Sequence, residues 1–430
     1  MPQGLRDHPH RRSLTDELHA RPHATLTAPQ RATHLAMLSG EDGGAADRSH
    51  VARLCERFGA APPDPEATHA MVDLGPFRLK WERHTEFSTY TFFQDGTDEP
   101  GDPFADPALA QVPQDWLDEL SGDLLVGVHV TMMSNEAPEW SLEALAALFG
   151  SDGIAGSLVA GGAAAAWMDF AIQDDGFGRI LLHDRHLRPR QAGRLVQRLL
   201  EIETYRTMAL LALPVARSFG AELTSARDRL SGIAAKIKAI GGLDDERRLL
   251  EQLTELSAEI EGSAAPAVYR FGAARAYYAL VRHRVAELRE ERIEGLQTVD
   301  EFLDRRLAPA MRTCEAVSDR LARFTDRVSR TSDLLRTRVD VQLEAQNRDL
   351  LSSMDRRARL QLRLQRTVEG LSVAAISYYV VSLVSYAAKA GKAAGLPLNA
   401  DIITGLAIPV VVGSVGYGMV RLRRRLENEA

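Results

Sequence analysis

Two short groups of polar side chains are placed so that they could do chemistry, and the first lies in the segment 81–87, Trp-Glu-Arg-His-Thr-Glu-Phe. Successive strand residues point to opposite faces, so a strand here would bring Glu82, His84 and Glu86 to one side. Two carboxylates and an imidazole could bind a cation or transfer protons. A solvated strand face with cross-strand ion pairs is the commoner explanation of this pattern, and we favour it.

The second group is a polar stripe in an apolar stretch near the C-terminus. Tyr378, Ser382, Ser385 and Lys389 recur at spacings of four, three and four, which places them on one helix face. In a membrane helix, such a stripe could line a pore. It could equally form hydrogen bonds to a neighbouring helix, with the lysine reaching towards the membrane interface. Both interpretations stay open, although a lysine at a pore mouth would repel cations.

Elsewhere the sequence contains no recognisable catalytic arrangement. It has no nucleophile elbow, no Ser/His/Asp pattern and no glycine-rich phosphate loop followed by lysine. The twelve histidines lack the spacing of a zinc site, and two cysteines, Cys55 and Cys314, cannot form a disulfide framework. We therefore expect a protein that is not an enzyme and that has no catalytic residues, no metal and no cofactor.

The composition is that of a globular chain. Of 430 residues, 45% are hydrophobic and 26% are charged, which excludes collagen-like and wholly disordered classes. The formal net charge of -7 argues against a protein that mainly coats nucleic acid, so no nucleic-acid partner is expected.

Two uncharged segments near the C-terminus predict a transmembrane hairpin. Residues 371–388 and 402–420 are each about long enough for a helix to cross a hydrocarbon layer of roughly 30 Å. Within the second span, Ser414 and Gly418 at i, i+4 favour close helix packing. Positive residues stay on the cytoplasmic side, and they flank both ends of the hairpin: Arg363, Arg366, Arg421, Arg423, Arg424 and Arg425. We expect two spans in the inner (cytoplasmic) membrane, with both termini cytoplasmic and the lipid bilayer as a partner.

The rest of the chain predicts an α+β protein. Strand patterns occur at 72–84, 86–94, 123–133, 167–173 and 179–184, with a short helix at 141–150. Beyond these strands we expect helices at 221–261 and 267–306, separated around Pro266, and a stalk helix that begins at Pro309. The expected parts are a loop-rich N-terminal segment (1–70), a cytosolic α/β domain with a mainly antiparallel or mixed sheet (71–190), a helical layer (191–308), a long stalk helix (309–370), the transmembrane hairpin (371–420) and a basic cytosolic tail (421–430).

An apolar seam runs along the predicted stalk at alternating spacings of three and four. Its members are Cys314, Val317, Leu321, Phe324, Val328, Thr331 and Leu335. Such a seam needs a partner, which is either the preceding helices of the same chain or other copies in a homo-oligomer.

Four stretches resemble a bacterial family of uncharacterised, membrane-anchored proteins, a domain of unknown function. They are SLTDELHARP (13–22), WERHTEFSTYTFF (81–93), DGFGRILLHD (175–184) and GRLVQRLLEIETYRTMALLALP (193–214). The resemblance covers most of the chain and implies no activity.

The layout is also similar to that of CorA-type divalent-cation transporters, which have a cytosolic α/β domain, a long stalk helix and a two-span membrane part. The Gly-Met-Asn signature of that family is absent, because residues 388–401 read AKAGKAAGLPLNAD. Two functions follow as expectations. One is an oligomeric ion or small-solute transporter or channel, and the other is a non-conducting membrane-anchored scaffold whose α/β domain binds a cytosolic protein partner.

Overall fold

The computed structural model describes residues 7–12, 14–15, 22–151, 153–237, 239, 241–394 and 399–428, with residues 422–428 as backbone only. The chain divides into two compact units. The first, which we call the sheet unit, contains Met1–Lys236 and Glu251–Thr331. The second, the hairpin unit, contains Ile237–Leu250 and Ser332–Ala430.

A nine-stranded sheet forms the centre of the sheet unit, in the order β2-β3-β4-β1-β5-β8-β7-β6-β9. The β5–β8 pair is parallel and the other pairs are antiparallel, so the sheet is mixed. This confirms the predicted α+β class. The strands are β1 (Gln30–Leu38), β2 (His69–Asp73), β3 (Arg78–Arg83), β4 (Ser88–Asp95), β5 (Asp123–Met133), β6 (Ala155–Val159), β7 (Ala164–Met168), β8 (Gly178–Asp184) and β9 (Glu291–Arg292).

The two faces of the sheet differ in chemistry because side chains alternate along each strand. One face packs on helix α2 (Gly44–Arg57) and carries the main apolar core, which includes Leu79, Trp81 and Phe92. The other face turns polar side chains of β1, β3 and β4 towards helix α5 (Pro189–Leu210).

The segment 1–70, predicted as short helices and loops, does contain a helix, α2, but it also contains a strand that was not predicted, β1. Strand β1 lies at the middle of the sheet, between β4 and β5. Its polar residues Gln30, Thr33 and His34 are nevertheless buried. A buried strand normally reads as a continuous apolar run, and these residues interrupt the pattern that would have revealed it.

Two other predicted strands are shifted. The segment 72–84 is divided by a turn at Gly75, whose φ of 89° is in the left-handed region, so that it supplies the end of β2 and all of β3. The strand predicted at 167–173 is β7, which ends at Met168 before Phe170 with a φ of 56°. Strand β6 was not predicted, because its sequence, AGSLV, has too few bulky residues for a strand pattern.

The long helices begin and end elsewhere than predicted. Pro266 lies inside α7 (Leu243–Leu288) and Pro309 inside α8 (Val299–Ala393), so neither proline marks a helix boundary. The break falls instead before Leu243, after the glycine pair Gly241-Gly242. The remaining helices are α3 (Gln114–Asp118), α4 (Leu142–Phe149), α6 (Ala212–Ile237) and α9 (Ala400–Asn428), with short 3-10 turns at Glu41–Gly43 and Ala108–Gln111.

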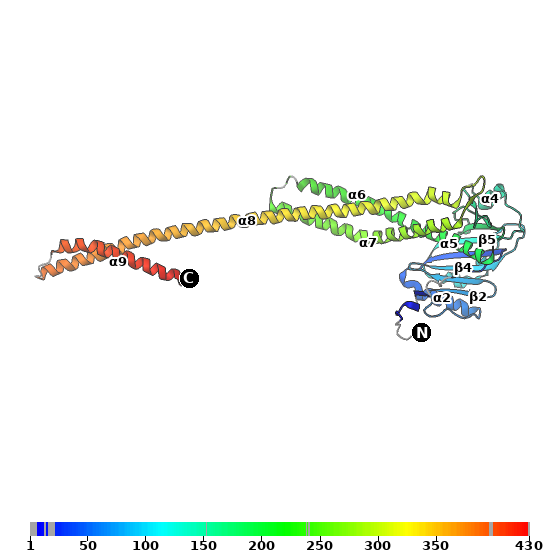
Figure 1. Cartoon of the computed structure of the whole chain (residues 1–430), viewed down its shortest axis with the longest axis horizontal. Helices are drawn as coiled ribbons and strands as arrows, with labels where there is room; N and C mark the ends of the chain where they lie inside the picture. Colours follow the sequence, from blue (N-terminus) through cyan, green and yellow to red (C-terminus); the bar gives the residue numbers. More distant parts are fainter. Residues whose placement is uncertain are drawn as a thin grey trace. The chain divides into compact units, whose positions relative to one another are not determined.

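Within the sheet unit, α6, α7 and the first part of α8 lie side by side (Figure 1). Ion pairs join α6 to α7 through Arg229 and Glu259 at 2.6 Å, and α7 to α8 through Arg282 and Asp300 at 2.6 Å. The apolar seam of α8 is buried in this bundle over Cys314, Val317, Leu321, Phe324 and Val328. This part of the seam is thus covered by helices of the same chain.

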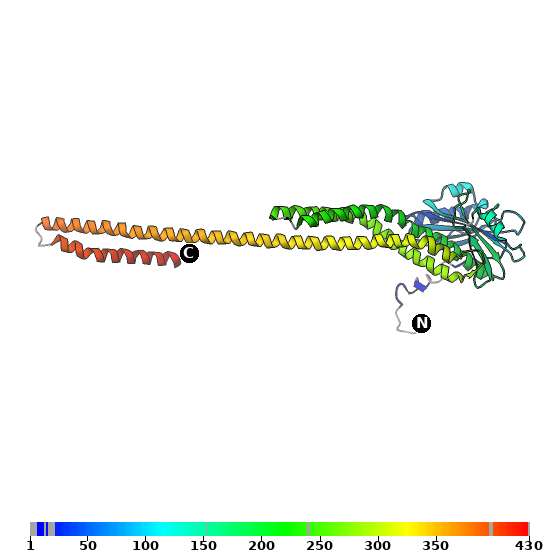
Figure 2. The same cartoon turned by 90° about the horizontal axis from the view of Figure 1, so that it is seen from above.

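The hairpin unit consists mainly of the end of α8 and the returning helix α9, which lie alongside each other (Figure 2). Each of these two helices contains a stretch that is long and apolar enough to cross a membrane. Large apolar side chains on both are exposed, among them Leu383, Leu406 and Val410. An apolar surface of this kind, left uncovered in a single chain, fits a membrane anchor.

Candidate functional site

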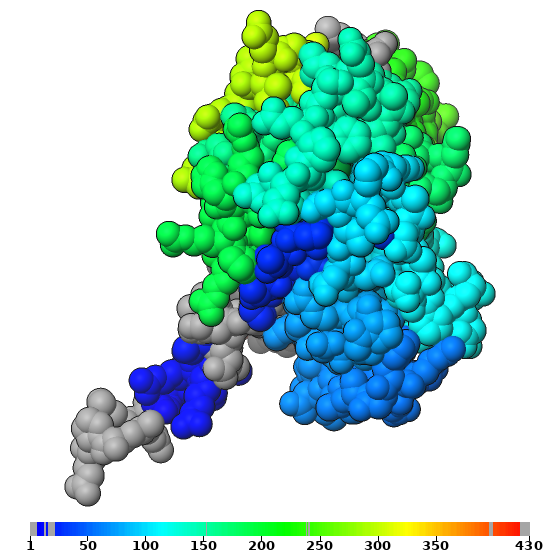
Figure 3. Space-filling model, turned by 90° about the vertical axis from the view of Figure 1, so that its right-hand side faces the viewer, coloured from blue at the N-terminus to red at the C-terminus, as the bar shows by residue number. Residues whose placement is uncertain are grey.

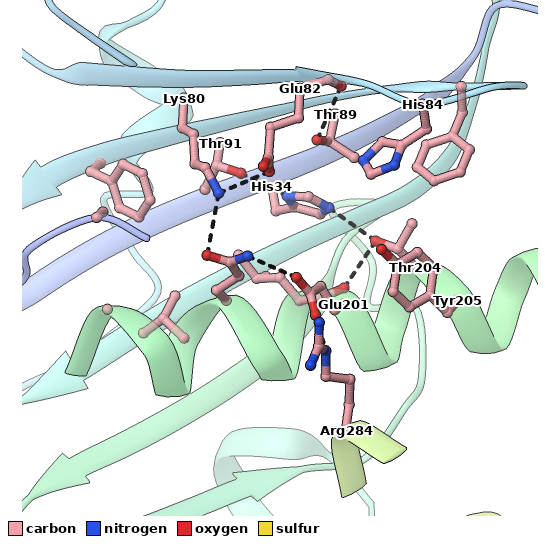
Figure 4. A pocket seen from close by; sticks show the side chains of 17 residues that line it. His34, Lys80, Glu82, His84, Thr89, Thr91, Glu201, Thr204, Tyr205 and Arg284 are labelled. Atoms are coloured by element: carbon pink, nitrogen blue, oxygen red, sulfur yellow. Dashed lines mark hydrogen bonds and ion pairs between the residues drawn. The ribbon is translucent and has the colours of Figure 1, made fainter. Parts of the chain in front are cut away.

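A pocket of about 270 Å³ lies in the sheet unit between the polar face of β1, β3 and β4 and helix α5 (Figure 4). We call it the β3–α5 pocket. Besides apolar side chains, it is lined by polar ones that come from β1, β3, β4, α5 and α7 and from the turn after β3: His34, Lys80, Glu82, His84, Thr89, Thr91, Gln197, Glu201, Thr204, Tyr205 and Arg284.

The N-terminal end of α5 is held against the chain that precedes β1. The Leu26 backbone N–H donates to the Pro189 carbonyl at 3.1 Å. A Cβ atom on Gly193 would lie 1.6 Å from the Ala24 carbonyl oxygen, so only glycine permits this approach. In Figure 3 the dark-blue residues of this N-terminal stretch lie beside the green residues of the α5 region. Both Ala24 and Gly193 line the pocket, so this contact shapes its edge.

A nearly buried ion pair forms the sheet side of the pocket. Lys80 Nζ and Glu82 Oε2 are 2.9 Å apart, and their side chains are 7% and 13% exposed. The two residues alternate on β3 with the core residue Trp81, which explains why both face α5. Lys80 also donates to Gln197 Oε1 at 3.3 Å, which links the strand to the helix.

The helix side of the pocket continues this network. Gln197 Nε2 donates to Glu201 Oε1 at 2.8 Å, and Glu201 pairs in turn with the Arg284 guanidinium from α7. Arg284 also pairs with Glu287 at 2.7 Å. Burial disfavours the charged form of Arg284, but the carboxylates of Glu201 and Glu287 outweigh it and raise the pKa of Arg284. The sheet side of the pocket thus carries one positive and one negative side chain, Lys80 and Glu82. The helix side also carries one of each, Arg284 and Glu201.

The buried imidazole of His34 is held as one neutral tautomer. Thr204 Oγ1 donates its single proton to the Leu200 carbonyl at 2.9 Å, so it accepts from His34 Nε2 at 3.0 Å. His34 Nδ1 then accepts from the Thr91 hydroxyl at 2.8 Å. Burial, together with the nearby charge of Lys80, lowers the pKa of His34 to about 3. His34 is therefore a fixed hydrogen-bonding group at neutral pH.

A cluster of basic residues lies near the N-terminal edge of the pocket. Burial and the positive charges of Arg194, Arg190, Lys80 and Arg198 lower the pKa of His23. Arg190, Arg194 and Arg198 follow one another at i, i+4 along α5, so they share a helix face. Arg198 of this face is paired with Glu287 of α7 at 3.3 Å.

The predicted trio of Glu82, His84 and Glu86 does not form one site. Strand β3 ends at Arg83, so His84 and Glu86 lie in the turn before β4 and do not continue the strand alternation. Glu82 and His84 both line the pocket, and the His84 ring stacks on Phe87 with centroids 4.3 Å apart. Glu86 points elsewhere and pairs with Arg270 of α7 at 2.6 Å.

Sequence reasoning missed most of the residues that line the pocket, although two signals were present. Lys80 precedes Glu82 by two strand positions, which predicts one face. Gln197, Glu201 and Thr204 follow spacings of four and three in a predicted helix, which places them on one face. No local pattern marked His34 or Arg284, because their partners are distant in the sequence.

The polar stripe of the hairpin is distributed over different environments. Tyr378 and Lys389 are exposed, whereas Ser382 and Ser385 are half-buried. Among the described residues, neither serine forms a hydrogen bond. The hydroxyl of the neighbouring Ser377 is buried and has no hydrogen-bond partner there either.

The packing predicted for Ser414 and Gly418 is not found among the described residues of the chain. Ser414 is exposed, and a Cβ on Gly418 would have no described neighbour within 4 Å. Of the flanking arginines, Arg363, Arg366 and Arg421 are exposed, and the side chains of Arg423, Arg424 and Arg425 lie outside the described ones.

No group of three or more His, Cys, Asp or Glu side chains that could hold a metal ion occurs in the part of the chain that the structure describes. A family model described as "Protein of unknown function (DUF3422)" matches residues 6–426. No curated protein and no solved structure matches the chain.

Proposed function

The chain belongs to this family of unknown function, and because the family supplies no activity, we propose from the geometry that it is a membrane-anchored binding protein whose sheet unit holds a small polar ligand in the β3–α5 pocket. The proposal places α8 and α9 in the inner membrane as the anchor, with both chain termini in the cytoplasm. It corresponds to the scaffold expectation, with a small molecule in place of the protein partner as the first ligand.

The observation that carries the proposal is the pairing of opposite charges on both walls of one pocket. Lys80 and Glu82 lie on the sheet, and Glu201 and Arg284 lie on the helices (Figure 4). Charged side chains are costly to bury, so a chain that only needed a stable core would place apolar residues here. A wall with both signs of charge and no excess of either suits a zwitterion or a neutral polar molecule.

The apolar part of the lining suits a ligand with a short hydrocarbon portion. Phe87, Phe93, Val196 and Leu200 line the same pocket. Ligand pockets commonly combine an apolar lining with a few polar groups that fix orientation. A free amino acid combines these features, because its ammonium and carboxylate groups match the paired charges. We infer binding and not catalysis, since the only fully buried imidazole of the described pocket, His34, is fixed by Thr91 and Thr204.

A thermal-unfolding titration of the detergent-solubilised full chain tests the proposal. All four tryptophans, Trp81, Trp116, Trp140 and Trp167, lie in the sheet unit, so their fluorescence follows its unfolding. Free amino acids should raise the unfolding temperature, while simple amines and simple carboxylates should have much weaker effects. A ligand at about 100 times its Kd stabilises the native state by about 2.7 kcal/mol.

Two matched double variants distinguish ligand binding in the β3–α5 pocket from a general effect of removing an ion pair. Replacing Lys80→Met together with Glu82→Leu should abolish the shift. Replacing the exposed pair Arg229→Met with Glu259→Leu should leave it unchanged. If no amino acid stabilises the native chain, or if the Lys80/Glu82 variant responds like the native chain, the proposed function is wrong.

A second candidate is the transporter, and one observation favours it. Ser382 and Ser385 are half-buried polar side chains on a segment that is apolar enough to span a membrane, and within the described residues they have no hydrogen-bond partner. In a homo-oligomer with α8 at its centre, they could face a path for ions or small solutes. Ser382→Leu with Ser385→Leu should then reduce flux in proteoliposomes, while Ser372→Leu, which removes a serine bonded to Val368, should not. A monomer in detergent would contradict this candidate.

A further inference from the structure

Four arginines surround a second pocket of the sheet unit, between α6 and α8. Arg227 comes from α6, and Arg320, Arg323 and Arg327 come from α8. The pocket has a volume of about 260 Å³ and is otherwise lined by Leu223, Thr224 and Phe324. We call it the four-arginine pocket. It shares no lining residue with the β3–α5 pocket.

The four guanidinium groups of this pocket have no carboxylate partner within the described part of the chain. None of the four takes part in an ion pair there, and no acidic residue among those described lines the pocket. Arginines nearby behave differently, since Arg229 pairs with Glu259 and Arg330 with Asp326. Four like charges around one hollow repel one another, and a bound anion would remove that repulsion.

The positions of the four arginines are set by the helix backbone and by the apolar side chains that line the same pocket. The spacing of Arg320, Arg323 and Arg327 places them on one face of α8. Phe324 and Leu223 line the same pocket and are buried, so its apolar side is packed within the helices. Gly220 on α6 lets the Arg320 side chain approach, because a Cβ there would lie 3.2 Å from Arg320 Nη2.

We propose that the four-arginine pocket binds a soluble anion that carries two or more phosphate groups. Planar guanidinium groups bind phosphate oxygens in pairs, and several of them together select multiply charged phosphates over single carboxylates. The phosphate groups of a lipid have the same chemistry. A soluble ligand is favoured because these arginines precede both Arg363 and the uncharged span 371–388, next to which lipid headgroups are expected.

Isothermal titration of the full-length protein in detergent, with inorganic triphosphate as the probe, tests this site. Triphosphate should bind at one site per chain, more tightly than orthophosphate, and the affinity should fall as salt is raised. Arg320→Gln and Arg323→Gln should each weaken binding about tenfold, as expected for the loss of a charge-assisted hydrogen bond. Arg330→Gln, a change on the same helix at an arginine that already has a partner, should leave the affinity unchanged.

Three results would overturn the proposal. The first is the absence of binding heat with triphosphate. The second is an equal loss of affinity in Arg330→Gln, which would indicate general charge attraction. The third is co-sedimentation with vesicles that contain anionic phospholipid, lost in Arg320→Gln, without competition by triphosphate, which would assign the site to a lipid headgroup. A normal unfolding transition in tryptophan fluorescence confirms that each variant is folded.

Discussion

His34 on β1 and Thr204 on α5 are separated by 170 positions in the chain and are joined by a hydrogen bond of 3.0 Å. Through Thr91, the same imidazole also contacts β4. One buried side chain therefore connects the middle of the sheet to the helix that covers it. Because both ring nitrogens are engaged in the neutral form, protonation of His34 would force the Thr91 hydroxyl to turn from donor to acceptor and would place a charge in the interior.

The stability of the sheet unit should fall steeply in mild acid. Burial lowers the pKa of His34 to about 3 and that of His129 to about 4, whereas unfolded histidine titrates near 6.5. Below pH 6.5 the unfolded chain binds protons that the folded chain excludes, so the free energy of unfolding decreases as the pH falls. Each histidine contributes about 1.4 kcal/mol per pH unit. His129 contributes down to about pH 4 and His34 down to about pH 3.

Urea unfolding followed by tryptophan fluorescence between pH 7 and pH 4 measures this slope. Within that window, His34→Gln should reduce the slope by about 1.4 kcal/mol per pH unit. The matched control is His283→Gln, which replaces a side chain that is 66% exposed and should preserve the native slope. An unchanged slope in His34→Gln would contradict the assignment of His34 as a neutral buried group.

Replacing only one partner of the Lys80–Glu82 pair should lower the free energy of unfolding more than replacing both partners. Lys80→Met leaves the Glu82 carboxylate nearly buried without its partner, and we expect a loss of about 3 kcal/mol in the free energy of unfolding. In the double variant Lys80→Met with Glu82→Leu no charge is left behind, so most of this loss should be recovered. Denaturation of the two variants and the native chain under the same conditions provides the comparison, and equal losses would show that the unpaired Glu82 carboxylate is not the cause of the destabilisation.

Gly193 should tolerate no side chain, in contrast to another helical glycine. An alanine there would collide with the Ala24 carbonyl, and we expect a loss of about 1–3 kcal/mol. A Cβ on Gly232 in α6 would have no described atom within 4 Å, so Gly232→Ala should stabilise the helix by about 0.5–1 kcal/mol. In urea unfolding, the free energy of unfolding should fall in Gly193→Ala and rise in Gly232→Ala. An unchanged free energy of unfolding in Gly193→Ala would disprove the close contact.

Local patterns in the sequence predicted what depends on short-range periodicity. The uncharged spans, the strand pair around Trp81 and the mixed α+β character follow from spacing within about 20 residues. The buried polar strand β1 does not, because Gln30, Thr33 and His34 look like loop residues until their distant partners are known. The helix boundaries predicted at Pro266 and Pro309 were wrong for a related reason. Pro266 and Pro309 carry a local penalty, and packing along α7 and α8 offsets it.

The residues of the β3–α5 pocket also fall into those that the sequence indicated and those that only the fold brings in. Glu82 and His84 were found because they are close in the sequence, and the strand alternation that was assumed for them ends at Arg83. The remaining charges come from α5 and α7, and Arg284 is 83 positions away from Glu201. No local pattern relates residues at that distance, so only the fold brings this pocket together.

The two apolar helices should hold the chain in the bilayer. After extraction of membranes with alkaline carbonate, the full chain should remain in the pellet, because removing the exposed apolar surface of α8 and α9 from lipid is unfavourable. A chain truncated after Arg366 lacks both spans and should appear in the supernatant. The same truncation retains every residue of the sheet unit, so its tryptophan fluorescence should still report a cooperative transition. Release of the full chain by carbonate would show that these helices are covered by protein and not by lipid.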